Sequence, residues 1–179
     1  MAQRLALREL QSRLAERLQA AQAHGNDASW LAVRMAQQGY LLPLAQAGEI
    51  FPLGVVRHVP YTKSWFRGVT SLRGGLFGVV DFAEFISGAA VSRSELVLAQ
   101  ASVVTLAPVL DVNCALLVDG LAGLRKSDAF RTSERAGAAD AAYWGTTWID
   151  AQGERWREVN LLALSQMPEF LHITAAVNH

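Results

Sequence analysis

The side chains best suited to chemistry do not gather into a motif anywhere in this 179-residue sequence. A metal cage needs several His, Cys or carboxylate ligands at short spacings, whereas the four histidines lie far apart along the chain. The single cysteine, Cys114, stands in an apolar run, which favours a buried thiol over a nucleophile. We therefore expect no metal, no cofactor and no enzymatic activity.

Nucleotide-binding and hydrolase motifs are missing from the sequence as well. No stretch has the glycine spacing of a phosphate-binding loop, and no serine lies in a Gly-x-Ser-x-Gly turn. Asp81 and Glu84 are nearby carboxylates that could serve as an acid and a base. They define the enzymatic alternative, an enzyme-associated module, although carboxylates are more often solvated charges.

The charge balance disfavours two classes of partner. Lys plus Arg equals Asp plus Glu at 16 each, so no net field draws the chain to nucleic acid or to anionic lipid. The five tryptophans are therefore interpreted as core or interface anchors rather than as a base-stacking platform. Charged residues interrupt the apolar runs at the N-terminus, and no later run is long enough to span a bilayer. We expect a cytoplasmic protein that does not insert into the membrane.

The first element to be positioned is an amphipathic helix over residues 3–23. Its apolar face consists of leucines and an alanine at helical spacing, namely Leu7, Leu10, Leu14, Leu18 and Ala21. Gly25 and Asn26, which follow, are typical residues past a helix C-terminus. An isolated helix of this length is marginal in water, so we expect its leucine face to dock on this protein or on a partner.

From Trp30 onward the apolar period changes to two, which is typical of strands. Strand-like runs separated by short gaps occur at 30–35, 40–44, 55–59, 69–73, 76–81, 96–106, 112–118, 121–126, 143–149 and 155–160. Short strands at this spacing favour small barrels or a sandwich over a parallel α/β sheet. The predicted fold class is therefore all-β with a few short helices.

Turn signals join several of these strands. Gly74-Gly75 and Asp119-Gly120 are each predicted to close a two-residue hairpin, and residues 150–153 a longer one. Helical turns are expected near 45–50, 61–66 and 82–86, with a terminal helix starting near Leu161. The polar stretch 126–142 is predicted to be an exposed excursion.

The segment from Gly68 to Phe82, GVTSLRGGLFGVVDF, resembles the hallmark of CheW-like domains, Gly-Val-x-Asn-Leu-Arg-Gly followed by an apolar strand that ends Pro-Val-x-Asp-Leu. Val59-Pro60 before the hallmark and Val118-Asp119-Gly120 after it also match the family. The sequence departs from the pattern at Ser71, Gly78 and Asn160, where the family usually has Asn, Pro and Asp. The resemblance extends over residues 30–173. It implies a CheW-like domain over 28–175, with two small five-stranded barrel-like lobes sharing a core, preceded by an N-terminal helix and linker over 1–27.

The resemblance also implies a function. CheW-like adaptors couple a methyl-accepting chemosensory receptor to a CheA-type histidine kinase, without catalysis, at membrane receptor arrays. The N-terminal helix and the segment 61–68 are similar to the PilI-type branch, which serves type IV pilus (twitching-motility) signalling, and a general chemotaxis coupling protein is the alternative. Protein contacts are expected at Ala47, Glu49, Trp65, Ser71, Arg73 and Gly74.

Arg73 is the most specific of these expectations, because the family's matching arginine is associated with contacts in the signalling complex. Arginine presents five donors in a rigid fork and is common at interface anchors. The competing structural interpretation is that Arg73 pairs within the protein, with Asp81 of the same hairpin as its candidate partner.

Overall fold

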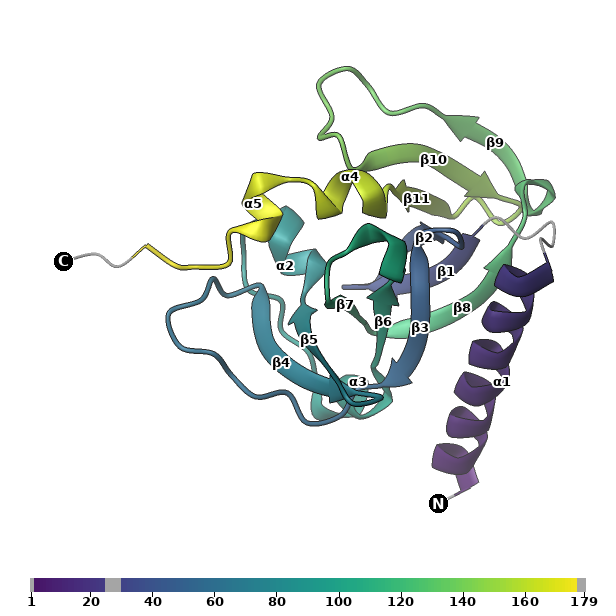
Figure 1. The fold of residues 1–179 in the computed structure, drawn as a ribbon. Helices are drawn as coiled ribbons and strands as arrows, with labels where there is room; N and C mark the ends of the chain where they lie inside the picture. The colour runs from purple at the N-terminus through teal and green to yellow at the C-terminus, as the bar shows by residue number, and fades with distance from the viewer. Residues whose placement is uncertain (1, 25–29, 177–179) are drawn as a thin grey trace.

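The computed structural model describes residues 2–24 and 30–176, and two curved β-sheets form its core (Figure 1). The predicted fold class, mainly strands with a few short helices and an N-terminal helix, is confirmed. One sheet has five strands, as expected for each lobe, and the other has six. Among the described residues, no helix is both long and apolar enough to cross a membrane.

The six-stranded sheet has the order β8-β1-β2-β11-β10-β9. Its strands are β1 (Trp30–Met35), β2 (Gln38–Pro43), β8 (Gly120–Arg125), β9 (Phe130–Glu134), β10 (Trp144–Asp150) and β11 (Arg155–Val159). β1 and β2 form an antiparallel hairpin, and β11 lies parallel to β2. The sheet therefore joins segments from the two ends of the chain.

The five-stranded sheet has the order β3-β6-β7-β5-β4. Its strands are β3 (Ala47–Pro52), β4 (Phe66–Leu72), β5 (Gly75–Val80), β6 (Ser102–Leu106) and β7 (Cys114–Val118). β6 and β7 are buried along their whole length. The helical elements outside the sheets are α1 (Ala2–His24), α2 (Phe82–Ser87), α3 (Glu95–Gln100), α4 (Leu161–Ser165), α5 (Pro168–Leu171) and the short 3₁₀ turns Pro108–Leu110 and Ser127–Ala129.

The two lobes are built on the same local plan. In each, a strand that pairs in parallel with a neighbour is followed by a polar cap and a short helix: Asp81 caps α2, and Asn160 caps α4. The backbone N–H of Asp81 donates to Trp65 O at 2.8 Å, and that of Asn160 donates to Tyr143 O at 2.8 Å. Asn160 therefore keeps the capping role at a position where the family usually has Asp.

Phe82 joins the lobes through an aromatic cluster. Its side chain is fully buried, and its ring lies 5.9 Å from that of Tyr40 and 5.8 Å from that of Tyr143, both edge-to-face. Aromatic pairs at such distances add to the hydrophobic stabilisation. Because Phe82 begins the helix that follows β5 while Tyr40 lies on β2, this cluster bridges the two sheets.

Most of the predicted strands are present, but four predictions were wrong. Residues 61–66, expected to be a helical turn, contain a hydrogen-bonded turn and no helix. Residues 45–50, expected to be a helical turn, contain the start of β3, and the first half of 96–106 forms α3 instead of strand. Residues 55–59 contribute only one isolated bridge, between Arg57 and Val69. The excursion 126–142 is largely exposed, as predicted, but it also contains β9.

The predicted hairpin at Asp119-Gly120 was also wrong. β7 and β8, which flank this dipeptide, lie in different sheets, so the chain crosses between the lobes here. The N–H of Asp119 donates to Arg34 O at 2.8 Å, and its carboxylate accepts from the N–H of Ala36 at 2.6 Å. These contacts hold the crossing against the β1–β2 turn.

The cap at Asn160 gives the first prediction. Asn160 Oδ1 accepts from the N–H of Ala163 at 3.0 Å, so Asn160→Ala should lower the free energy of unfolding by about 1 kcal/mol. Asn160→Asp, which retains the acceptor, should stay close to wild type. Urea unfolding followed by tryptophan fluorescence measures both, and equal losses in the two variants would show that the cap contributes nothing.

Candidate protein-interaction surface

Arg73 lies in the tight turn between β4 and β5. Leu72 pairs with Gly75, so the two-residue loop is Arg73-Gly74, one position earlier than the predicted Gly74-Gly75. Both loop residues have positive φ, 46° for Arg73 and 79° for Gly74. An arginine in this conformation costs about 1 kcal/mol or more relative to an unstrained backbone. The turn therefore exposes a large cationic side chain at a position that suits glycine better.

The Arg73 side chain is 67% exposed and forms an ion pair with Glu49 of β3 at 2.9 Å. Its guanidinium also lies 5.9 Å from the ring centre of Phe51. The alternative prediction, that Arg73 pairs with Asp81, is wrong, because Asp81 pairs with Arg93. An exposed ion pair of this kind contributes little to stability, about 0–1 kcal/mol, and leaves most guanidinium donors facing solvent.

Glu49 connects this turn to the N-terminal helix. Its Oε2 atom receives both the Arg73 guanidinium, at 2.9 Å, and the side-chain amide of Gln19 on α1, at 3.4 Å. Glu49 and Arg73, two of the residues expected to contact other proteins, are therefore neighbours. The contact with α1 is a feature that the sequence analysis did not predict.

The other expected contact residues divide into exposed and buried ones. Ser71 and Gly74 are exposed beside Arg73. Ala47 is 1% exposed, so it supports β3 from within. Trp65 immediately precedes β4, at the end of the strand far from the turn. It is buried, and its ring centre lies 6.0 Å from that of Phe170 in a stacked arrangement. Of the six expected residues, Glu49, Ser71, Arg73 and Gly74 therefore offer side chains or backbone to a partner at this turn.

An apolar groove runs beside the turn. It has a volume of about 540 Å³ and is lined by residues from β3, the segment after it and the β4–β5 hairpin, including Phe51, Val55, Leu72 and Leu76. Val55 is 79% exposed and Leu76 is 62% exposed. The sequence analysis missed this groove because it treated 55–59 as a strand of the sheet. The signal available in the sequence was the alternation of side chains within 76–80, which places Leu76 on the face of the strand opposite to the buried Val79.

Asp81 and Glu84, the candidate acid and base, are both buried. Arg93, whose side chain is 5% exposed, pairs with Asp81 at 2.5 Å and also with Asp119. One Glu84 oxygen accepts from the N–H of Val91 at 2.9 Å and lies 3.4 Å from the Arg67 guanidinium. Asp81 and one oxygen of Glu84 are therefore engaged in internal contacts, whereas Glu84 Oε2 is buried without a hydrogen-bond partner.

Burial and hydrogen bonds act in opposite directions on the pKa of Arg93. Desolvation lowers the pKa of Arg93, but its hydrogen bonds to Asp81 and Asp119 outweigh that effect and leave the pKa raised. Arg93 therefore remains charged in the interior and balances the carboxylates around it. The sequence analysis did not identify this residue.

Within the part of the chain that the structure describes, no three His, Cys, Asp or Glu side chains converge as a metal site requires. Cys114 is buried on β7, as predicted from its apolar neighbours. Burial raises the pKa of its thiol to about 12. The thiolate form is therefore scarce at neutral pH.

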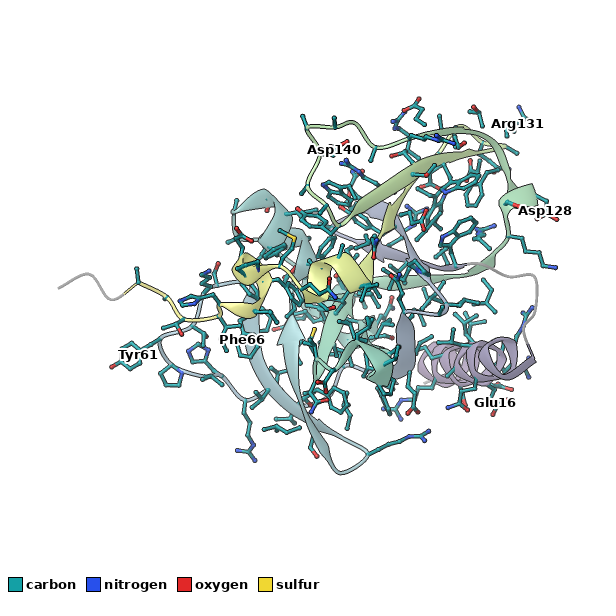
Figure 2. All side chains as sticks on the ribbon, turned by 45° about the horizontal axis from the view of Figure 1, so that its top comes forward. Glu16, Tyr61, Phe66, Asp128, Arg131 and Asp140 are labelled. Carbon is teal, nitrogen blue, oxygen red and sulfur yellow. The ribbon has the colours of Figure 1, made fainter. Side chains whose placement is uncertain are left out.

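Replacing Arg93 tests the buried cluster. Arg93→Leu leaves Asp81 and Asp119 without their cation, so the free energy of unfolding should fall by about 3–5 kcal/mol. The control Arg131→Leu removes an exposed arginine of β9 (labelled in Figure 2) and should change stability by less than about 0.5 kcal/mol. Similar losses in the two variants would mean that the buried pairs carry no special weight.

Cys114 gives a second test of the core. At pH 8 a maleimide should modify the folded protein very slowly and the denatured protein quickly, because only unfolding exposes the thiol and lowers its pKa. A Cys114→Ser/Ser133→Cys variant, with its cysteine on exposed β9, should react quickly in both states. Mass spectrometry measures the rates, and rapid labelling of folded wild type would contradict the buried assignment.

Comparisons with known proteins agree with this architecture. A family model described as the CheW-like domain matches residues 29–169. Protein PilI of Pseudomonas aeruginosa is 28% identical over 130 residues, which cover 73% of this chain and 70% of that protein. The scaffolding protein TtCheW from Thermoanaerobacter tengcongensis has a similar fold, with a TM-score of 0.58 and 14% identity over 75% of this chain and 89% of that one. The resemblance of the hallmark segment is confirmed.

Proposed function

We propose that this chain, which belongs to the CheW-like domain family, is a non-catalytic adaptor that couples a methyl-accepting chemosensory receptor to a CheA-type histidine kinase. The observation that carries the proposal is the exposed, conformationally costly Arg73 in the β4–β5 turn. An interface anchor needs directed hydrogen-bond donors and apolar surface that a partner can cover. The guanidinium at the hairpin end supplies the donors, and the groove beside it supplies the apolar surface.

The chemistry of the interior supports an adaptor rather than an enzyme. Asp81 and Glu84 are buried in ion pairs and hydrogen bonds, and the Cys114 thiol is buried and protonated at neutral pH. The features that face solvent are a cation, an apolar groove and strand edges, all of which suit binding of another protein. We infer that the chain works by holding partners together in the cytoplasm at receptor arrays.

The similarity to PilI favours the type IV pilus branch of chemosensory signalling for this chain. A general chemotaxis coupling protein is the alternative, since the fold is also that of the scaffolding protein TtCheW. Affinity purification of the tagged chain from its own cells separates the two: co-purification of a kinase and receptor encoded with pilus genes supports the first, and of those encoded with flagellar genes the second.

Charge reversal at Arg73 tests the anchor. Arg73→Glu should change the melting temperature little, because the side chain is 67% exposed and its ion pair is on the surface. Affinity for the receptor or the kinase should fall by about 2 kcal/mol or more, which exceeds a tenfold change in Kd. Calorimetric binding and thermal unfolding are measured on one preparation, with Arg131→Glu as the control. Unchanged binding with lowered stability would refute the anchor role.

Arg73→Gly separates the side chain from the backbone. Glycine adopts a positive φ readily, so this variant should be at least as stable as wild type while binding as weakly as Arg73→Glu. Chemical denaturation and the same binding assay measure the two quantities. A variant that loses stability and keeps its affinity would show that arginine is needed for folding instead.

A further inference from the structure

Helix α1 covers a seam between the two sheets. β3 is an edge strand of the five-stranded sheet and β8 an edge strand of the six-stranded sheet, and α1 packs against both (Figure 1). Edge strands present backbone groups and apolar side chains that need a neighbour. The helix thus closes a surface that the sheets leave open.

The contacts that hold α1 in this seam are few among its described side chains. Leu14 and Leu18, one helical turn apart, are buried and join the main hydrophobic core. The polar contacts come from two side-chain amides: Gln11 donates to Ser102 Oγ at 3.0 Å, and Gln19 to Glu49 at 3.4 Å. The seam therefore recognises a helix mainly through two apolar side chains at i and i+4 spacing.

The helix does not fill the seam. A groove of about 450 Å³ remains between the middle of α1 and the start of β8, lined by Leu10, Leu14, Arg17 and residues 119–123. Leu10, part of the predicted leucine face, is 60% exposed beside it. A larger or second helix would bury more apolar surface here than α1 does.

The seam is continuous with the candidate anchor. Glu49 receives Gln19 of α1 and Arg73 of the β4–β5 turn on the same Oε2 atom. A partner that displaces α1 removes the hydrogen bond from Gln19 to the Glu49 carboxylate and reaches Arg73 directly. Because the Arg73 guanidinium is largely exposed, a carboxylate on that partner has free donors to pair with.

We propose that α1 regulates the receptor contact of the proposed function: in the free protein α1 occupies the β3–β8 seam, and a helical segment of the receptor binds in this seam by displacing α1. The partner helix carries apolar side chains at i and i+4 and an acidic residue toward Arg73. The inference rests on the proposed function for the identity of the partner. The apparent affinity of the partner helix for the protein is lowered because α1 covers the seam in a fraction of the molecules.

The first experiment uses the full chain and a helical probe. A fluorescent peptide of residues 2–24, stapled between the exposed positions 12 and 16, should bind the Leu14→Asp/Leu18→Asp variant at least about tenfold more tightly than wild type. The Arg8→Gln/Ser12→Asp variant changes the helix charge equally at exposed positions and should behave as wild type. The Leu14→Asp/Leu18→Asp chain is called the released variant. Equal binding of the peptide to all three chains, or no binding to the released variant, would contradict the proposal that the seam binds a helix.

The second experiment adds the receptor. The purified signalling-tip hairpin of the co-purifying receptor should compete with the peptide and bind the released variant about tenfold more tightly than wild type. Equal affinity for both chains would refute displacement while leaving the adaptor function intact. Peptide binding as expected, with no receptor binding to any variant, would instead refute the proposed receptor partner.

A covalent restraint covers the case in which the released variant does not fold. Gln11 also donates to Gln100 O at 3.3 Å, so Gln11→Cys and Gln100→Cys can be joined by a short bismaleimide. The cross-linked chain should bind the hairpin about tenfold more weakly than the same chain left unlinked, and equal binding would contradict displacement. A wild-type dimer that the peptide dissociates in light scattering would make α1 of a second copy the occupant and overturn the receptor assignment.

Discussion

The fold depends on one buried cation. Arg93 enters the interior from the loop before α3 and pairs with Asp81, which caps α2, and with Asp119, where the chain crosses from one sheet to the other. Asp119 in turn accepts from Ala36 in the β1–β2 turn. Burying these charges together costs desolvation, so the cluster adds less stability than specificity. It determines which turns of the two sheets face each other.

That constraint gives the outer features of the molecule a rigid base. With the lobes held by Arg93 and by the aromatic cluster around Phe82, the β4–β5 hairpin projects from a sheet whose strands β6 and β7 are fully buried. The hairpin and the contacts of Arg73 with Glu49 and Phe51 of β3 give this side chain a defined direction, which suits recognition. The α1 helix is different, because the contacts of its described side chains with this body are mainly those of Leu14, Leu18 and two side-chain amides.

Local pattern predicted the α1 helix, most strands and a tight turn beside Arg73, because alternation, helical spacing and glycine act over a few residues. It misplaced that turn by one residue, since Arg73 itself lies in the loop. It did not predict β3, since Ala47 and Gly48 have low strand propensity and become strand only by pairing with β6. Nor did it predict Arg93, which stands between two serines and looks solvated until its partners, 12 and 26 positions away, are placed. Contacts that distant in sequence leave no local signature.

The parallel pairing of β2 with β11 has a consequence for how the chain is made. β2 begins at Gln38, and the strand beside it ends at Val159, so the six-stranded sheet lacks a central member until residue 159 has left the ribosome. β1 and β2 can form a hairpin early, but the other flank of β2 stays unpaired until β11 is available. During synthesis, the nascent chain therefore carries an open strand edge of the kind that invites pairing with another chain.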